Sequence, residues 1–141
     1  MRQLYEQNRL GDGFIAIKNM VHDTVHSYDA MQLSTGEKHL LIKRKTFFED
    51  DFTVGCQIGP YLFNESTLFH IKNTVETLLK NKVSPIYLDE IGVLELENKG
   101  LHTTVDMLVK SNTALVLSMR EDLVTPLQNK YKFDVQKIIK V

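Results

Sequence analysis

Two adjacent acids, Asp89 and Glu90, are the residues of this chain whose types and position best suit them to chemistry. They follow the apolar segment 86–88, Ile-Tyr-Leu, which is typical of a parallel strand buried on both faces. Such a strand cannot hold charge in its middle, so acids at its carboxyl end must reach a crevice, water or a cation. One acid could hold a magnesium ion through its water shell while the other orients or deprotonates a water. The alternative interpretation is that two acids simply end a strand and begin a loop.

Composition sets the frame in which these acids must be positioned. The chain has 141 residues, 43% of them apolar and 25% charged, which is ordinary for a single globular domain over residues 1–141. A net charge of -1 offers no basic field for a nucleic acid and no polybasic face for a membrane, so we expect neither partner. The single cysteine, Cys56, excludes an intrachain disulfide. The first residues lack the apolar core of a signal peptide, and we expect a cytoplasmic protein.

The first part of the chain, residues 1–53, has the pattern of an antiparallel meander that follows a short helix. Extended segments at 13–20, 25–33 and 38–43 are separated by turn residues. The turn containing Gly36 lacks the Gly-Lys-Ser/Thr ending of a phosphate-binding loop, and we interpret it as a hairpin turn.

The second part, residues 54–141, alternates between helix and strand patterns. This alternation predicts an α/β fold with a mostly parallel sheet covered by helices, to which the antiparallel meander is attached. Asn64 or Ser66 can cap the first helix, and Thr125 can cap the last one. The expected helices are 65–81, 97–110 and one that starts at 125, and the expected strands are 86–88, 113–117 and 134–141.

The segment from Tyr87 to Leu96, Tyr-Leu-Asp-Glu-Ile-Gly-Val-Leu-Glu-Leu, resembles a family signature. It is similar to the Asp-Glu-Ile-Gly-x-Met-Glu-Leu motif of the thermophile-type nucleoside-triphosphatase family, a branch of the P-loop NTPases. Three weaker matches stand in the right order, so the resemblance covers nearly the whole chain: Gly13-Phe14, Leu33-Ser34-Thr35-Gly36-Glu37 and Ile58-Gly59-Pro60-Tyr61. The resemblance implies that Asp89 is the magnesium-side carboxylate and that Glu90 is the catalytic, water-activating one.

The chain also departs from the family pattern. Members of the family begin with a strand and a Gly-x-x-Gly-x-Gly-Lys-Thr-Thr loop that holds the nucleotide phosphates, and residues 1–141 contain no such loop. Residues 15–19 replace the family's Thr-Glu-x-x-Arg, and Val93 stands where a lysine is usual. We therefore expect a P-loop NTPase-like fold that is missing its first strand and phosphate loop. Losing several charge-assisted contacts should reduce nucleotide affinity by orders of magnitude.

Three functions follow as alternatives. The chain is expected to bind or hydrolyse a nucleotide, with magnesium, only together with a separate chain that supplies the phosphate loop. It could instead be a non-catalytic binding or regulatory module on a degenerate NTPase fold, or an enzyme of another class that uses the acids as a metal site. Because strand edges that lose a neighbour invite pairing with another chain, we also expect a homo-oligomer or a complex with the chain that carries the loop.

Arg120 is a further candidate for the site. It follows the strand 113–117, so its carboxyl-end position should share a rim with Asp89. Arg120 could face a phosphate. An ion pair with Glu121, Asp122 or Glu90 is the favoured alternative.

Overall fold

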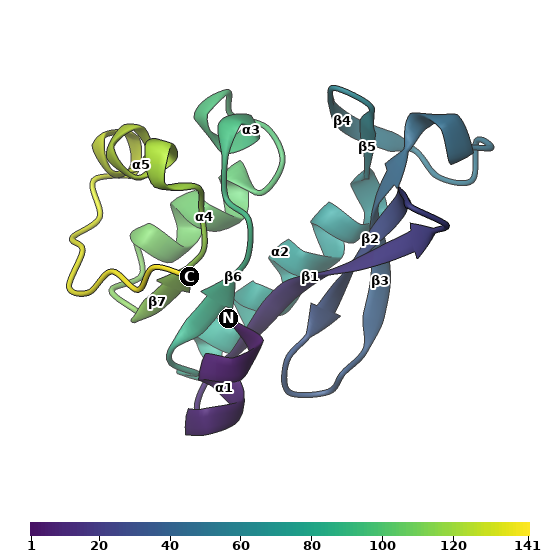
Figure 1. Ribbon diagram of the computed structural model, residues 1–141. Coiled ribbons are helices and arrows are strands. Elements are labelled where there is room, and N and C mark those ends of the chain that lie inside the picture. Colours follow the sequence, from purple (N-terminus) through teal and green to yellow (C-terminus); the bar gives the residue numbers. More distant parts are fainter.

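A seven-stranded sheet runs through the molecule, with helices packed on it (Figure 1). The computed structural model describes residues 1–141. The strands are β1 (Asp12–Val21), β2 (Thr24–Gln32), β3 (Lys38–Arg44), β4 (Val54–Ile58), β5 (Tyr61–Asn64), β6 (Ile86–Leu88) and β7 (Leu115–Leu117). The helices are α1 (Arg2–Asn8), α2 (Glu65–Lys80), α3 (Val93–Leu96), α4 (His102–Val109) and α5 (Val124–Tyr131), with short 3-10 turns η1 (Lys45–Phe47) and η2 (Glu121–Leu123).

The sheet is mixed, with the strand order β4-β5-β3-β2-β1-β6-β7. Four of its pairings are antiparallel and two, β1 with β6 and β6 with β7, are parallel. The expectation of a mostly parallel sheet was therefore wrong. The connections among β1, β2 and β3 and the hairpin between β4 and β5 are too short for crossover helices, so these strands must pair antiparallel. The antiparallel part continues past residue 53 to Asn64.

Strand β6 has a neighbour on each side. Leu88 pairs with Phe14 of β1 on one side and with Leu117 of β7 on the other. The outer edges of the sheet are β4 and β7. The strand expected at 134–141 does not form. Its apolar residues stay largely exposed, with Ile138 61% and Ile139 57% exposed, so no burial of side chains drives this segment into the sheet.

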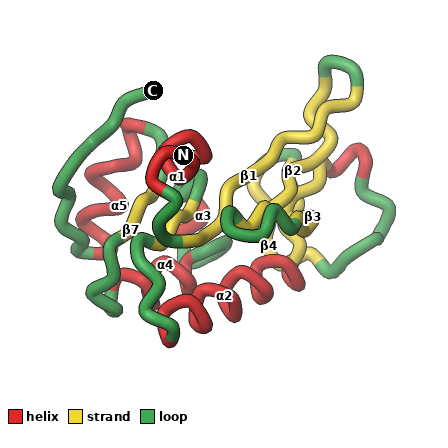
Figure 2. The backbone as a smooth tube through the Cα atoms, turned by 90° about the horizontal axis from the view of Figure 1, so that it is seen from below, coloured by secondary structure: helices red, strands yellow, loops and turns green.

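Helix α2 is the helix that the sequence pattern predicted over 65–81, and this prediction is confirmed. The Asn64 side chain accepts a hydrogen bond from the Ser66 amide at 3.1 Å and caps the helix, as expected. The stripe Ile71, Val75 and Leu78 faces the sheet, and these side chains are at most 9% exposed. Figure 2 shows α2 running along one face of the sheet.

The main core lies between the sheet and the helices α2, α4 and α5. Burying a Leu, Ile, Val or Phe side chain stabilises the fold by about 1.5–3 kcal/mol. On the other face of β6 the ring of Tyr5, from α1, meets the ring of Tyr87 edge-on at a centroid distance of 5.8 Å. The core residues are Phe14, Ala30, Leu41, Ile42, Ile71, Val75, Leu78, Ile86, Leu88, Ile91, Val105, Leu108, Leu127 and Tyr131.

Two helix starts differ from their predictions. Helix α4 begins at His102 rather than near residue 97, because the chain turns at Gly100, which has a φ of 62°. Helix α5 begins at Val124, and Thr125 does not cap it. The 3-10 turn η2 leads directly into α5 through Leu123, which is already helical, so Thr125 lies inside the helix. No helix in the structure combines the length and apolar character needed to cross a bilayer.

Candidate functional site

The acid pair lies where the sequence pattern placed it, directly after a fully buried strand. Ile86, Tyr87 and Leu88 are 0%, 1% and 0% exposed. Asp89 is half-buried and Glu90 is exposed. The chain therefore brings two carboxylates to the surface at the carboxyl end of β6, the position where α/β sheets commonly bind ligands.

Two neighbouring strands hold the Asp89 carboxylate. Its Oδ2 accepts a hydrogen bond from the Ala16 amide of β1 at 3.0 Å. Its Oδ1 accepts a short hydrogen bond from the Ser118 hydroxyl, which follows β7 directly. Each carboxylate oxygen has two lone pairs, so one acceptor position remains on each oxygen. The orientation of Asp89 is fixed by β1 and β7 without using up its capacity to bind.

Glu90 is positioned by its backbone and stays open to solvent. It adopts a left-handed conformation with φ of 57°, and its amide donates to the Ser118 hydroxyl at 2.8 Å. Partial burial and then the Asp89 carboxylate raise the pKa of Glu90, while Lys18 opposes this shift. A carboxylate with a raised pKa is a better proton acceptor near neutral pH, which suits a general base.

A small cavity lies beneath Asp89. Its volume is about 20 Å³, and Asp89 is the one charged residue in a lining that includes Phe14, Ala16 and Leu88. This space suffices for about one water molecule and excludes a phosphate group. Any larger ligand must approach the acids from the open surface.

The acid pair suits a magnesium ion that keeps several of its water ligands. No cluster of three or more His, Cys, Asp or Glu residues could enclose a metal. Magnesium usually keeps several waters and binds through one or two carboxylates together with phosphate oxygens. The free acceptor positions of Asp89 and the exposed Glu90 suit such an ion, and they do not suit a metal held by protein groups alone.

Arg120 is engaged with a neighbour. Its Nε and a terminal guanidinium nitrogen donate to the two Asp122 oxygens at 3.1 and 2.8 Å. This exposed pair is one of the ion pairs that the sequence left open. The next acid, Glu121, pairs with Lys140 at 2.7 Å. A phosphate-facing role for Arg120 requires its release from Asp122.

Ser118 is the site residue that sequence reasoning missed. Besides its two side-chain contacts, its backbone amide donates to Leu88 and its carbonyl accepts from Ile91. The signal was present, since Ser118 follows the apolar segment 115–117 just as Asp89 follows β6.

Glu95, the last acid of the signature segment, is buried and structural. It is 4% exposed, and its carboxylate accepts hydrogen bonds from the amides of Gly92 and Leu101 at 2.7 and 2.8 Å. Burial raises the pKa of Glu95, and these hydrogen bonds oppose the shift. A Cβ on Gly100 would collide with Glu95 Oε2, so glycine leaves room there for the buried carboxylate. Glu95 thus shapes the turn that joins α3 to α4.

Residues of helix α5 form hydrogen bonds with α3 and with the start of α4. The Tyr131 hydroxyl donates to the Glu95 carbonyl at 3.0 Å and lies 2.7 Å from His102 Nδ1. Lys130 Nζ donates to the Leu96 carbonyl at 2.9 Å. Burial, together with Glu95, raises the pKa of Tyr131 to about 12. Glu95 and Leu96 are therefore tied to α5 and support the acid pair from below the surface.

A second buried acid, Asp12, lies at the start of β1, beside the end of β6 opposite to the acid pair. It is 4% exposed and pairs in register with Ile86, at the start of β6. Its oxygens accept hydrogen bonds from Gln32 Nε2 at 2.7 Å and from the Ser34 hydroxyl at 2.6 Å. Asp12 ties the start of β1 to the turn after β2 and is too far along the strand to join the site.

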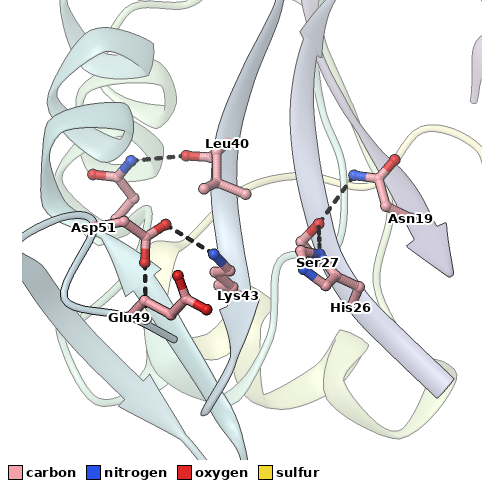
Figure 3. A network of polar contacts seen from close by, with 8 residues as sticks. Asn19, His26, Ser27, Leu40, Lys43, Glu49 and Asp51 are labelled. Atoms are coloured by element: carbon pink, nitrogen blue, oxygen red, sulfur yellow. Dashed lines mark hydrogen bonds and ion pairs between the residues drawn. The ribbon is translucent and has the colours of Figure 1, made fainter. Parts of the chain in front are cut away.

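Polar contacts fix the antiparallel strands that extend beyond the site (Figure 3). The Asp51 carboxylate accepts from Lys43 Nζ at 2.9 Å and from the Glu49 amide at 3.1 Å, which closes the loop after β3. The Lys43 hydrogen bond lowers the pKa of Asp51. Asn19 donates to the Ser27 hydroxyl at 3.2 Å across β1 and β2. The Asn19 contact joins β2 to β1, the strand that supplies the Ala16 amide to Asp89.

The fold is that of an α/β protein with two carboxylates at the carboxyl end of an inner parallel strand of its sheet. A family model described as NTPase matches residues 1–141. The chain belongs to this NTPase family, which confirms the family resemblance of the signature segment.

A solved structure agrees with this assignment. The chain is similar in fold to a structure entitled "Solution Structure of a Human Cancer-Related Nucleoside Triphosphatase", with a TM-score of 0.58 and 17% sequence identity. The similarity covers 91% of this chain and 73% of the human protein. A search of curated protein sequences finds no match.

Proposed function

We propose that this chain provides the acidic half of a nucleoside-triphosphatase site. In this proposal Asp89 is the magnesium-side carboxylate, and Glu90 orients or deprotonates the attacking water. The phosphate-binding loop is supplied from outside residues 1–141. The observation that carries the proposal is the fixed orientation of Asp89, through Ala16 and Ser118, beside a Glu90 with a raised pKa.

Each residue has a physical task in this scheme. The two hydrogen bonds to Asp89 hold its carboxylate with free acceptor positions toward the surface, which preorganises it for a hydrated cation. The raised pKa of Glu90 makes this side chain a better acceptor for the proton of a water. A bound magnesium ion would supply neutralisation of the charge on the phosphate oxygens.

The first test measures nucleotide binding by the 141-residue chain alone. Isothermal titration with magnesium and ATP or GTP should give no binding in the micromolar range, because no loop in these residues grips the phosphates. The oligomeric state is measured by native mass spectrometry on the same sample. Micromolar binding by a monomer would overturn the dependence on a loop from outside these residues.

The second test asks whether the acids are competent for hydrolysis. A strand and phosphate loop from an active nucleoside triphosphatase is fused ahead of Met1. The fusion should hydrolyse ATP or GTP with magnesium, and Glu90→Gln should reduce the turnover by about 100-fold or more. Glu97→Gln is the control, since Glu97 is exposed and makes only a surface contact with Lys99 at 3.7 Å.

The alternative, a non-catalytic binding or regulatory module, has its own outcome in this test. The ion pair between Arg120 and Asp122 favours it, because it occupies a cation that could otherwise face a phosphate. A fusion that binds nucleotide without hydrolysing it, and whose binding does not change in Glu90→Gln, would support the module and contradict the catalytic proposal.

A further inference from the structure

One face of the antiparallel strands carries two tyrosines and two cations. The nearest of these residues lie close to Glu90. The rings of Tyr28 and Tyr61 meet edge-on with centroids 6.0 Å apart. The Arg44 guanidinium lies 6.0 Å from the centre of the Tyr61 ring. Lys18 is the cross-strand partner of Tyr28. Neither Lys18 nor Arg44 forms an ion pair with an acid.

These residues lie on the same face of the sheet and connect with the acid pair. Tyr28 and Tyr61 are half-buried, and each packs one side against the main core. Lys18 is close enough to Glu90 to oppose the rise in its pKa. Burial, then Tyr61 and then Glu90 raise the pKa of Tyr28, so its hydroxyl stays protonated and can donate a hydrogen bond. Tyr61, Tyr28 and Lys18 therefore follow one another across β5, β3, β2 and β1 toward the strand that carries the acids.

We infer that this surface binds the nucleoside polyphosphate itself, with the base on Tyr28 and Tyr61 and the phosphates toward Lys18 and the acid pair. The inference rests on the proposed function of Asp89 and Glu90 and adds the residues that hold the substrate. Tyrosine rings stack on bases of any sequence, and an arginine over the ring adds a cation–π contribution. Lys18 is a point charge suited to a phosphate.

The order of the strands determines which end of the nucleotide lies nearer the acids. Lys18 lies on β1, next to β6 and Glu90, whereas Tyr61 lies on β5, three strands further from the acids. Neighbouring strands are about 4.8 Å apart, so Lys18 and Tyr61 are separated by about 14 Å across the sheet. An extended nucleotide can bridge such a distance, with its phosphates at Lys18 and its base at Tyr61.

The charges favour a short phosphate chain over a long polyanion. Only Lys18 and Arg44 contribute positive charge to this surface, and Asp89 and Glu90 stand beside it. A nucleic acid would place further phosphates against these acids without cations to balance them. A single nucleotide, with its base on the tyrosines, avoids this repulsion.

The test is an NMR titration of the 141-residue chain with three separate probes: ATP, adenosine and inorganic tripolyphosphate. Without a phosphate loop the affinity should be weak, with a Kd on the order of 1 mM for ATP. ATP should shift the amide signals of all four residues, Lys18, Tyr28, Arg44 and Tyr61. Adenosine should shift those around the tyrosines, and tripolyphosphate those around Lys18. No shift at about 10 mM ATP, or shifts confined to other surfaces, would overturn the inference.

Variants then separate the contributions. Lys18→Gln should weaken ATP binding by about 5-fold and leave adenosine binding unchanged, because one charge-assisted contact is lost. Tyr61→Leu should weaken both ligands by about 5-fold or more, whereas Tyr61→Phe, which keeps the ring and protects the core packing, should weaken neither by more than about 2-fold. Lys38→Gln is the control, an exposed cation at the other end of β3. Equal losses in Lys18→Gln and Lys38→Gln would contradict a specific role for Lys18.

The same variants distinguish this inference from the proposed function. In the fused protein, Lys18→Gln and Tyr61→Leu should raise KM with little change in kcat, whereas Glu90→Gln should lower kcat. ATP binding at the tyrosines without hydrolysis in the fusion would sink the catalytic proposal alone. Hydrolysis with an unchanged KM in Lys18→Gln and Tyr61→Leu would sink this inference alone.

Discussion

The Ser118 hydroxyl donates to the Asp89 carboxylate and thereby joins the carboxyl ends of β7 and β6. The same hydroxyl accepts a hydrogen bond from the Glu90 amide at 2.8 Å. One serine therefore fixes both the side chain of the first acid and the backbone of the second. The geometry of the acid pair depends on β7 as much as on β6.

Ser118→Ala should lower the free energy of unfolding by about 1–2 kcal/mol, because a half-buried carboxylate and an amide both lose a partner. The matched control is Ser66→Ala, since Ser66 is exposed and its hydroxyl makes no hydrogen bond within the protein. Urea denaturation of both variants measures the difference. Equal changes in the two variants would mean that the Ser118 contacts add nothing to stability.

Glu90→Gln should leave the fold intact and stabilise it slightly at neutral pH. The raised pKa of Glu90 means that the folded state holds this proton more readily than the unfolded state. Its favourable contribution is present below the unfolded pKa of about 4.3 and is lost as pH rises through the folded value. The side chain is exposed, so the gain at pH 7 should be less than about 1 kcal/mol.

Urea denaturation of Glu90→Gln at neutral pH and at about pH 4 tests this expectation, with Glu97→Gln as the control. The gain should disappear at the lower pH. A large loss of stability in Glu90→Gln at neutral pH would make this residue structural and would argue against an open site.

Gly100→Ala should destabilise the protein by more than Gly36→Ala. Both glycines have positive φ, 62° and 74°, so both substitutions strain the backbone by about 1 kcal/mol. Only at Gly100 does the new Cβ meet another atom, Oε2 of Glu95 at 2.3 Å, whereas the Cβ at Gly36 meets open space. The difference in the free energy of unfolding, about 1–3 kcal/mol, reports the collision with the buried carboxylate. Similar losses in both variants would show that Glu95 moves away freely.

Stability should fall as pH drops below about 6.5, partly because of His70. Burial, followed by the neighbouring His39, lowers the pKa of His70, and Glu37 opposes this shift. A base with a lowered pKa contributes stability above the unfolded pKa and loses it as pH falls toward the folded value. The His70 Nε2 is buried without a hydrogen-bond partner, so a charge there has nothing to offset it.

His70→Phe should flatten the decline in stability between about pH 7 and pH 5, since the ring would still pack against Phe14 and cannot take up a proton. His22→Asn is the control, because His22 is an exposed turn residue with φ of 54° that asparagine tolerates. Thermal unfolding at several pH values measures both. An unchanged pH profile in His70→Phe would assign the decline to other groups.

The sequence predicted the parts of the fold that local patterns determine. Helix α2 has an amphipathic stripe and an asparagine cap, and β6 has three apolar residues before two acids, so both were found. The prediction of a strand at 134–141 was wrong. A strand needs a partner strand and buried side chains, and these residues have neither. The prediction that Thr125 caps α5 was wrong, because η2 leads into the helix ahead of Thr125.

For the site, too, the sequence predicted what depends on neighbouring residues and missed what depends on distant ones. The position of Asp89 and Glu90 followed from the strand that precedes them. Asp89 contacts Ala16, which lies 73 positions away in the sequence, and Ser118, which lies 29 positions away. No local sequence pattern specifies contacts over such separations. Glu95 could not be assigned as buried, because its burial depends on the turn at Gly100 and on α5.

The short pairing between β6 and β7 has a mechanical consequence. Strand β7 is held to β6 by only three paired residues, and Ser118, which contacts both acids, follows β7 directly. A shift of β7 relative to β6 would therefore pull Ser118 away from both acids at once. The arrangement of the two carboxylates thus reports whether this edge of the sheet is intact.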